Sequence, residues 1–296
     1  MDKTIYALGF FDGVHIGHQA LLRACRNLAK EHGTRTGVVT FANHPDALVF
    51  GAAPGLINTP EDRELLLTVD YAMDTVVTLP FDRTLQDTPW DAFLENLILR
   101  FGAAGFVCGE DFRFGHRGEG SADTLSAFCR GRGLPYAVVP EQLLEGIRVS
   151  STYIRGLIEA GDMGRTADFL GHPYRLTGTV RHGKQLGRKL GFPTANMAFP
   201  EGLARPKFGV YACIARLQEG DFPAVTNLGL RPTVDGQSVT VESWLLDYEG
   251  ELYGRELTLD FYSFLRPERK FETLDAMRDE IFRNAQQARD VLQDKQ

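Results

Sequence analysis

The stretch of sequence that decides the fold is GFFDGVHIGH, residues 9–18. It follows an apolar run, residues 4–10, that predicts a strand, and it leads into residues 16–29, whose apolar side chains recur at helical spacing. Gly13 and Gly17 allow the backbone to approach a ligand closely. His15 and His18 stand at the start of the helix, where free N–H groups and the helix dipole favour a phosphate. We interpret the stretch as a phosphate-binding turn; the alternative is a pair of surface histidines beside an ordinary turn.

The rest of the first half alternates between strand-like and helical segments. The predicted strands are residues 4–10, 36–41, 75–79, 105–108 and 136–139, and the predicted helices are residues 16–29, one opening at residues 59–62, residues 88–99 and residues 122–130. Alternation of this kind predicts a parallel sheet covered by helices on both faces. Ligands of such sheets bind beyond the carboxyl ends of the strands, which is where residues 9–18 fall.

The second half changes character after about Gly171. Strand-like segments rich in β-branched and aromatic residues, residues 208–217, 224–227, 239–246 and 256–265, follow one another with turns between them. Only residues 273–292 have a helical pattern. This half predicts an antiparallel sheet or barrel with a terminal helix, and we expect two domains, residues 1–171 and 172–296.

Composition narrows the classes of partner. The 296 residues carry a net charge of −7, and the whole excess lies in residues 1–172, while residues 173–296 are balanced. Neither half has the basic excess of a general nucleic-acid binder. No apolar run approaches the about 20 residues of a membrane helix, and residues 1–5 do not resemble a secretory signal. The four scattered cysteines form no CxxC pair. We therefore expect a cytoplasmic protein that binds small molecules, without a nucleic-acid or membrane partner; the oligomeric state is not predictable.

A second motif, GRKLGFPTAN, occupies residues 187–196. In an extended segment Thr194 and Asn196 point the same way, so a hydroxyl and a carboxamide oxygen can serve one hard cation, most naturally Mg²⁺ with ATP phosphates. Glycines and basic residues precede them and can fold over phosphates: Gly183, Lys184, Gly187, Arg188 and Gly191. The alternative is a solvated basic loop with a structural turn.

Glu242 gives this second motif a chemical context. Val241 and Leu245 lie on the opposite face of the same predicted strand. A carboxylate beside a magnesium site is suited to accept a proton from an attacking alcohol, a contribution of about 10²–10⁴-fold. The alternative is an ordinary charge on an edge strand.

The stretch 9–18 resembles the HxGH signature of the nucleotidylyltransferases, and more narrowly the FMN adenylyltransferase half of the bacterial bifunctional riboflavin kinase/FMN adenylyltransferase (FAD synthetase) family. Residues 40–45 (TFANHP, with His44-Pro45 as a rigid loop), 109–115 (GEDFRFG, with possible stacking rings on either side of Arg113) and 150–155 (SSTYIR) fit in order, although Asn43 stands where the family commonly has proline. The resemblance implies a Rossmann-like domain with His15 and His18 as catalytic residues. It implies ATP and FMN contacts at Gly9, Phe11, Asp12, Gly13, Gly17, His44, Pro45, Asp111, Phe112, Arg113, Ser150, Ser151, Thr152 and Arg155.

The PTAN motif and the glycines of residues 178–192 are similar to the flavokinase domain of the same family, as are residues 209–212, 227–233 and 265–271. The resemblance implies a β-barrel in which Thr194 and Asn196 hold Mg²⁺ and Glu242 is the base. It implies ATP and flavin contacts at Gly183, Lys184, Gly187, Arg188, Gly191, Pro193, Asn227 and Arg266.

Together the two resemblances predict a bifunctional enzyme that phosphorylates riboflavin to FMN with MgATP and adenylylates FMN to FAD with release of pyrophosphate. Two alternatives are left open. One is an HxGH adenylyltransferase for a different phosphate ester, fused to a β domain of unrelated role. The other is a flavin-sensing or RNA-binding module that uses the basic loop 181–189 and consumes no ATP.

Overall fold

The computed structural model describes residues 3–51, 53–183, 187, 191–233, 236–293 and 295. Contacts divide the chain into two compact units, Met1–Ser151 and Thr152–Gln296. By this division most of α7 (Ser151–Ala160) and all of α8 (Met163–Leu170) go with the second unit. The functional boundary after Gly171 stays a prediction.

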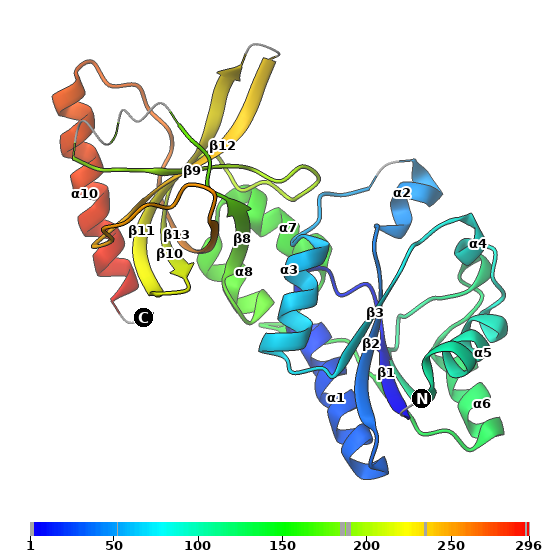
Figure 1. Ribbon diagram of the computed structural model, residues 1–296. Coiled ribbons are helices and arrows are strands. Elements are labelled where there is room, and N and C mark those ends of the chain that lie inside the picture. The colour runs from blue at the N-terminus through cyan, green and yellow to red at the C-terminus, as the bar shows by residue number, and fades with distance from the viewer. Residues whose placement is uncertain are drawn as a thin grey trace. The chain divides into compact units, whose positions relative to one another are not determined.

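The first unit is built on a five-stranded parallel sheet (Figure 1). The strands lie in the order β3-β2-β1-β4-β5. β1 is therefore central, with β2 and β3 added on one side of it and β4 and β5 on the other. Their bounds are β1 Thr4–Leu8, β2 Arg35–Phe41, β3 Thr75–Leu79, β4 Ala103–Gly109 and β5 Tyr136–Val139. The main helices are α1 Ile16–His32, α3 Pro60–Leu65, α5 Trp90–Phe101 and α6 Ala122–Arg132, with the short α2 Pro45–Phe50 and α4 Arg83–Gln86 between them.

Alternation along β1 explains why helices cover both faces of this sheet. Ile5 and Ala7 belong to a core with α1, whereas Tyr6 and Leu8 belong to a core with α5 and α6. All four side chains are buried. The predicted parallel sheet with two covered faces is therefore confirmed.

The second unit contains a six-stranded antiparallel sheet in the order β8-β13-β10-β11-β12-β9. The strands are β8 Tyr174–Thr179, β9 Ala195–Ala198, β10 Gly209–Leu217, β11 Gly220–Thr233, β12 Gly236–Leu245 and β13 Glu256–Arg266. A bridge between Arg181 and Asn196 brings the chain after β8 against β9, so the two edge strands approach each other. The predicted antiparallel sheet with a terminal helix is confirmed.

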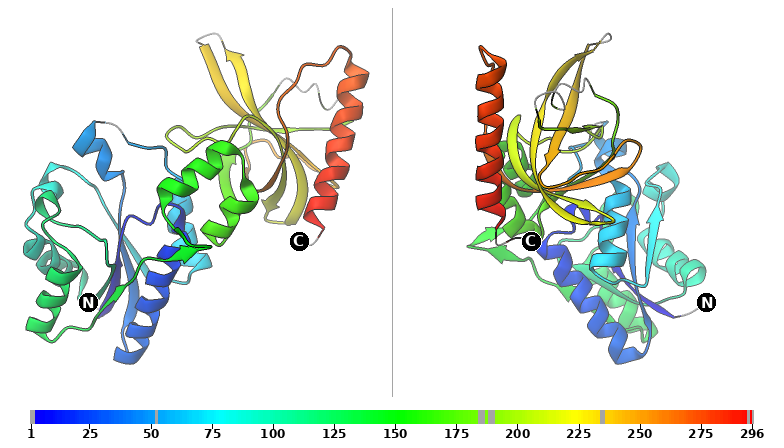
Figure 2. Two further views of the ribbon diagram at one scale, coloured as in Figure 1. Left: turned by 180° about the vertical axis from the view of Figure 1, so that it is seen from behind. Right: turned by 60° about the vertical axis from the view of Figure 1, so that its left-hand side comes forward.

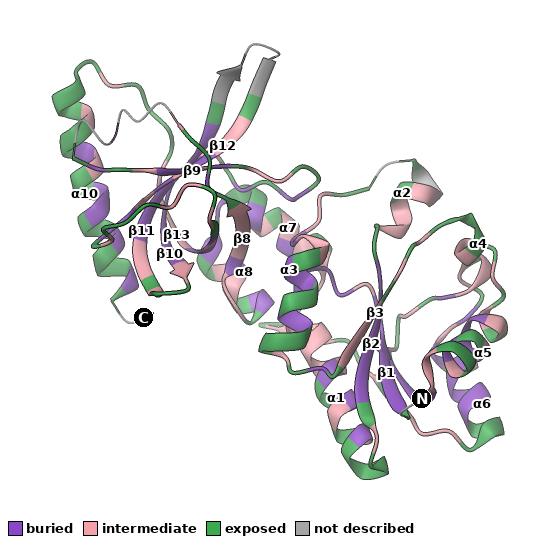
Figure 3. Cartoon of the chain, in the orientation of Figure 1, coloured by how far each residue is buried: buried purple, intermediate pink, exposed green. Residues whose placement is uncertain are grey.

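The terminal helix, α10 (Leu274–Leu292), lies along one side of this sheet (Figure 2). Figure 3 shows buried residues on one side of α10 and exposed residues on the other. Ala285 and Ala288 pack against Val210 and Ile214 of β10, whose alternate residues Tyr211 and Cys213 point to the other face and are also buried. The helix therefore serves as a cover for one face of the barrel.

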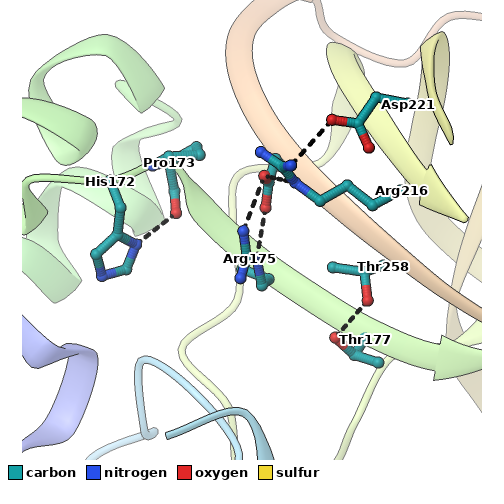
Figure 4. A network of polar contacts seen from close by, with 8 residues as sticks. His172, Pro173, Arg175, Thr177, Arg216, Asp221 and Thr258 are labelled. Carbon is teal, nitrogen blue, oxygen red and sulfur yellow. Dashed lines mark hydrogen bonds and ion pairs between the residues drawn. The ribbon is translucent and has the colours of Figure 1, made fainter. Parts of the chain in front are cut away.

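A polar network ties three neighbouring strands of the barrel together (Figure 4). Arg175 on β8 and Arg216 on β10 both bind Asp260, a fully buried carboxylate on β13, with N–O distances of 2.7 and 2.5 Å. Thr177 and Thr258 share a hydrogen bond across β8 and β13. Such a carboxylate is retained in the interior because both cations stay with it.

Some element bounds differ from those predicted. The first strand ends at Leu8 instead of residue 10, because the chain turns into a left-handed conformation at Phe11. Helix α1 continues to His32, where Gly33 at φ 62° ends it. Strand β11 is much longer than residues 224–227, because residues 220–228 pair with β10 and residues 224–233 pair with β12. Residues 44–45 do not form a rigid loop: His44 caps α2 and Pro45 is its first residue.

Two candidate nucleotide sites

The first site is built on the turn that follows β1. Phe11 and Val14 have positive φ angles of 59° and 41°, and both side chains are fully buried. Non-glycine residues rarely adopt this conformation, and it persists only where the surroundings enforce it. Gly13, at φ 80°, fits the same turn without strain.

Hydrogen bonds from elsewhere in the unit hold the turn. The Oδ1 atom of Asp12 accepts the N–H of Ile57 at 2.8 Å, and the Oδ1 atom of Asn58 accepts the N–H of Gly13 at 3.2 Å. Ser151 donates its hydroxyl to the carbonyl of Asp12 at 3.0 Å. Asp12 is buried, so within this structure it positions the turn.

The two histidines form one stacked pair at the start of α1. His15 caps the helix, its Nδ1 atom accepting the N–H of His18 at 3.2 Å, and the rings lie 3.6 Å apart. At Gly17 a Cβ atom would lie 3.1 Å from the His15 ring, so any larger residue would make that ring shift. The glycine thus makes room for the His15 ring, while the close approach of a ligand stays a prediction.

His18 is held in its neutral form. Burial lowers the pKa of His18 well below its usual value, and the neighbouring His15 and Arg63 lower it further. Among the described residues the Nδ1 atom of His18 is buried and has no hydrogen-bond partner. A buried polar atom of this kind calls for a partner that a ligand can supply.

A pocket of about 260 Å³ opens in front of this pair and brings many of the predicted residues together. Its lining includes Gly9, His15, Gly17 and His18, with Asp111 and Phe112 from the loop after β4 and with Ser150 and Ser151. Phe112 lines the pocket, whereas Phe114 is buried, stacks on Phe112 and meets Phe93 at a tilted angle.

Other predicted residues do not line this pocket. His44 packs its ring edge on Phe10, 4.8 Å between centroids, and Arg113 is exposed; neither is among the pocket residues. Thr152 and Arg155 belong to the second compact unit. Their roles in the first site stay predictions.

Arg148 is a pocket residue that sequence reasoning missed. It lies on β7 (Ile147–Arg148), which pairs with β6 (Leu143–Leu144), and it binds Asp111 at 2.5 Å and Glu141 at 2.7 Å. Its position two residues before Ser150 was the available signal. It supplies a cation to a site whose other charged lining groups are acidic.

The second site is a row of polar side chains across three antiparallel strands. The register places Asn227 of β11 opposite Glu242 of β12, and Glu242 opposite Asn196 of β9. Directly opposed residues share one face of a sheet, so the three side chains lie in a row. Val241 and Leu245 are buried on the other face, as predicted.

The PTAN segment brings two oxygen donors to one end of this row. Asn196 donates its Nδ2 atom to the carbonyl of Thr194 at 3.2 Å, so the carboxamide oxygen is the atom that a cation would meet. Gly183 lies against this group: a Cβ atom there would be 2.7 Å from the carboxamide. A Cβ atom at Gly187 would clash with the carbonyl oxygen of Phe192. The Gly187 carbonyl accepts the N–H of Phe192 at 2.9 Å. Lys184 and Arg188 lie outside the described residues.

A pocket of about 270 Å³ stands over the row. Its polar lining includes Thr194, Asn227, Glu242 and Arg266, and its apolar lining includes Phe192, Trp244, Phe271, Met277 and Ile281. A pocket lined by aromatic, apolar and polar side chains suits a flat ring system that carries a polar chain.

Thr194 also lines a second cavity, together with Gly191 and Pro193. The far side of this cavity is formed by Tyr248, Tyr253 and the residues between them, and Tyr253 stacks on His182 at 3.8 Å. Thr194 therefore lines both cavities.

Arg266 is fixed to α10. It donates its Nε atom to Asn284 at 2.9 Å and pairs with Glu280 at 3.3 Å, while Glu280 also binds Arg269 at 2.7 Å and Arg283 at 2.6 Å. Burial lowers the pKa of Arg266, which stays a cation beside this carboxylate. Glu280 thus joins the segment after β13 to the helix that lines the same pocket.

The architecture defines a two-site nucleotide-dependent transferase: a parallel sheet with paired histidines at the carboxyl ends of its strands, and a barrel with a carboxylate beside two oxygen donors. Residues 1–153 match the family model of FAD synthetase, and residues 170–292 match that of riboflavin kinase. The chain belongs to the bifunctional riboflavin kinase/FMN adenylyltransferase family. This membership contradicts the alternative of an unrelated β domain.

Relatives cover nearly the whole chain. A bifunctional riboflavin kinase/FMN adenylyltransferase of Listeria monocytogenes is 32% identical over 97% of this chain and 92% of its own length. One of Haemophilus influenzae is 34% identical over 95% and 92%. A crystal structure described as a macrolide-efflux protein from Streptococcus pneumoniae has a TM-score of 0.88 at 27% identity, covering 97% of this chain and 94% of that one. In the described part of this chain, no helix is both long and apolar enough to cross a membrane.

Proposed function

We propose that this chain makes FAD from riboflavin in two ATP-dependent steps, each in its own site. In the kinase step the 5′-oxygen of riboflavin bonds to the γ-phosphorus of ATP, and the bond from that phosphorus to the β-phosphate oxygen breaks to release ADP. In the adenylyl step a phosphate oxygen of FMN bonds to the α-phosphorus of a second ATP, and pyrophosphate leaves. The observation that carries the proposal is the presence of two differently built sites, each in a segment that matches one of the two activities.

Glu242 is the base of the kinase step. Its carboxylate lies between Asn227 and Asn196 in the row and lines the cavity that suits the flavin. It accepts the proton of the 5′-hydroxyl as the oxygen attacks. Thr194, shared with the neighbouring cavity, directs the γ-phosphate toward that oxygen.

Thr194 and Asn196 fit a magnesium ion, because both offer neutral hard oxygens and leave further positions for phosphate oxygens and water. When bound, Mg²⁺ neutralises phosphate charge during the transfer. Gly183, Lys184, Gly187, Arg188, Gly191 and Pro193 complete the ATP side of this site.

His15 and His18 serve the adenylyl step. At the helix N-terminus the imidazoles of His15 and His18 donate hydrogen bonds to the α-phosphate as its charge grows in the transition state. The unpartnered Nδ1 atom of His18 supports this role. Thr152 and Arg155 are assigned to the phosphates of the same ATP.

The partners are riboflavin, FMN and ATP. We assign the adenylyltransferase to residues 1–171 and the kinase to residues 172–296. The four cysteines are free and buried, which fits a reducing cytoplasm.

A time course of riboflavin, FMN and FAD in the presence of MgATP tests the proposal. FMN should appear first and FAD should follow as FMN declines. Turnover without FMN would contradict the kinase assignment, and FMN that never becomes FAD would contradict the adenylyltransferase assignment. Binding of riboflavin without ATP consumption would support the alternative of a flavin-sensing module.

A further inference from the structure

Arg63 is a fully buried cation that contacts Phe10, a residue lining the first site. It belongs to α3, and it is 1% exposed. Its Nη1 atom donates to the carbonyl of Phe10 at 3.1 Å, and its Nη2 atom donates to the carbonyl of Phe41 at 2.7 Å. These carbonyls lie at the carboxyl ends of the neighbouring strands β1 and β2. One guanidinium therefore fixes both strand ends at the edge of the sheet where the pocket opens.

The guanidinium acts on the residue that enters the strained turn. Its carbon lies 4.8 Å from the centre of the Phe10 ring, and the Phe10 carbonyl also accepts the hydroxyl of Thr40 at 2.7 Å. The next residue, Phe11, is the first with a positive φ angle. Fixing Phe10 from two sides prevents the turn from relaxing into an ordinary extended strand end.

Arg63 shares this task with residues close to it in the chain. Ile57 and Asn58 bind Asp12 and Gly13, as described above, and Thr59 caps α3 by accepting the N–H of Asp62 at 3.0 Å. Residues 57–63 thus bind residues 10–13 through hydrogen bonds of Ile57, Asn58 and Arg63. We call residues 57–63 the turn support.

We propose that Arg63 is a positioning residue for adenylyl transfer, acting through the turn support to hold the turn that carries His15 and His18.

Two further observations favour a functional reason for this arginine. A buried cation is costly, and an apolar side chain of similar size is often as stabilising. Arg63 also contributes to the low pKa of His18, after burial and His15. A residue kept for packing alone would need neither the charge nor the two bonds at the site edge.

The experiment rests on the proposed FMN adenylyltransferase and uses the whole chain, so that FMN formation by the barrel is an internal control. FAD formation from FMN is measured in the unmodified chain, in Arg63→Met and in Arg63→Lys, at temperatures where melting curves show the first unit folded. We expect kcat for FAD to fall about 10²-fold in Arg63→Met, the size typical of a catalytic group displaced by about 1 Å. The KM values for FMN and ATP and the rate of FMN formation should stay unchanged. Arg63→Lys should recover part of the kcat, because a lysine restores the charge and a donor.

Arg26→Met is the matched control. Arg26 also donates to a backbone carbonyl, that of Tyr71 at 2.7 Å, but it lies in the second half of α1, away from the pocket residues. It should leave kcat unchanged. An unchanged kcat in folded Arg63→Met, an equal loss in Arg26→Met, or a loss that follows only the unfolded fraction would overturn the inference. Absence of FAD formation in the unmodified chain would overturn the proposed function itself.

Discussion

The two candidate sites of this chain are built by different means. In the first, the backbone sets the geometry: a turn with positive φ angles leads into α1, where the rings of His15 and His18 stack and His18 is neutral. In the second, side chains do the work: Asn227, Glu242 and Asn196 stand in a row on a regular sheet. A backbone site depends on every contact that enforces its conformation, whereas a side-chain site depends on the few groups in the row. The first should therefore be sensitive to remote changes and the second to local ones.

The largest expected effect is a crosswise loss of the two activities. His15→Ala with His18→Ala should abolish FAD formation and leave FMN formation intact, because both histidines line the pocket of the first unit and neither lines the cavities of the barrel. Glu242→Ala should lower the rate of FMN formation about 10²–10⁴-fold, the range of a general base, while FAD is still made from supplied FMN. Rates of the two steps, measured separately with riboflavin and with FMN as substrate, check this.

Loss of both activities in either variant would contradict the separation of the sites. Glu242→Gln is the matched control for the base, because it keeps the shape and removes the proton-accepting charge. It should be as inactive in the kinase step as Glu242→Ala.

A glycine tests how strictly the second site depends on side-chain position. In Gly183→Ala the new Cβ atom would meet the Asn196 carboxamide at 2.7 Å and push it out of the row. We expect FMN formation to fall at least tenfold, since a shift of about 1 Å can cost about 10²-fold. FAD formation from FMN should not change. The measurement is kcat for FMN formation at several concentrations of Mg²⁺.

Gly164→Ala is the control, because this glycine lies in α8 of the same unit and nothing stands within 4 Å of its Cβ position. It should leave both activities unchanged. A normal kinase rate in Gly183→Ala would show that the row tolerates displacement, contrary to the comparison above.

A smaller effect is expected at Glu280, which supports the second site from α10. Glu280→Gln removes the carboxylate that binds Arg266, Arg269 and Arg283. We expect the free energy of unfolding of the second unit to fall by about 1–3 kcal/mol, the usual effect of a lost charged hydrogen-bond partner. The KM for riboflavin should rise because the pocket side formed by Arg266 and α10 loosens.

Arg283→Ala is the control that separates a change in the pocket from a general loss of stability. Arg283 is mostly exposed and pairs with Glu280 within one helical turn, so its loss should cost less than about 1 kcal/mol and should not change KM. Equal KM values in Glu280→Gln and the unmodified chain would mean that Glu280 serves stability alone.

The same difference between the sites explains what could be predicted from the sequence. The strands of the first unit are apolar runs and its helices carry clear caps, such as Thr59 before Pro60, so the parallel sheet followed directly. Strands β8 and β9 were missed because they are short and mix glycine or asparagine with apolar residues. What makes them strands is their pairing with β13 and β12, which no local pattern records.

Within the sites, residues in motifs were predictable and residues that support the motifs were not. His15, Thr194 and Glu242 stand in recognisable patterns. The register that brings Asn227, Glu242 and Asn196 into one row depends on the pairing of distant segments. Arg63 looks like a surface charge on a short helix, because an arginine in a polar segment is normally exposed, and its burial depends on how α3 docks on the sheet.

The smallest expected effect is a pH dependence of stability that belongs to the first site alone. Because the pKa of His18 is lowered in the folded chain, the unfolded chain binds a proton that the folded one does not as the pH falls below about 6.5. The free energy of unfolding of the first unit should then fall by up to about 1.4 kcal/mol per pH unit, the limit for one proton. Urea denaturation between pH 7.5 and 5.5 in a Trp244→Phe background, where Trp90 reports on the first unit, measures this. His18→Asn should remove that part of the slope, whereas His32→Asn, at an exposed position of the same helix, should keep it. An identical slope in His18→Asn and the unmodified chain would mean that the first site does not depend on a neutral buried histidine, and the contrast between the two sites would then rest on the strained turn alone.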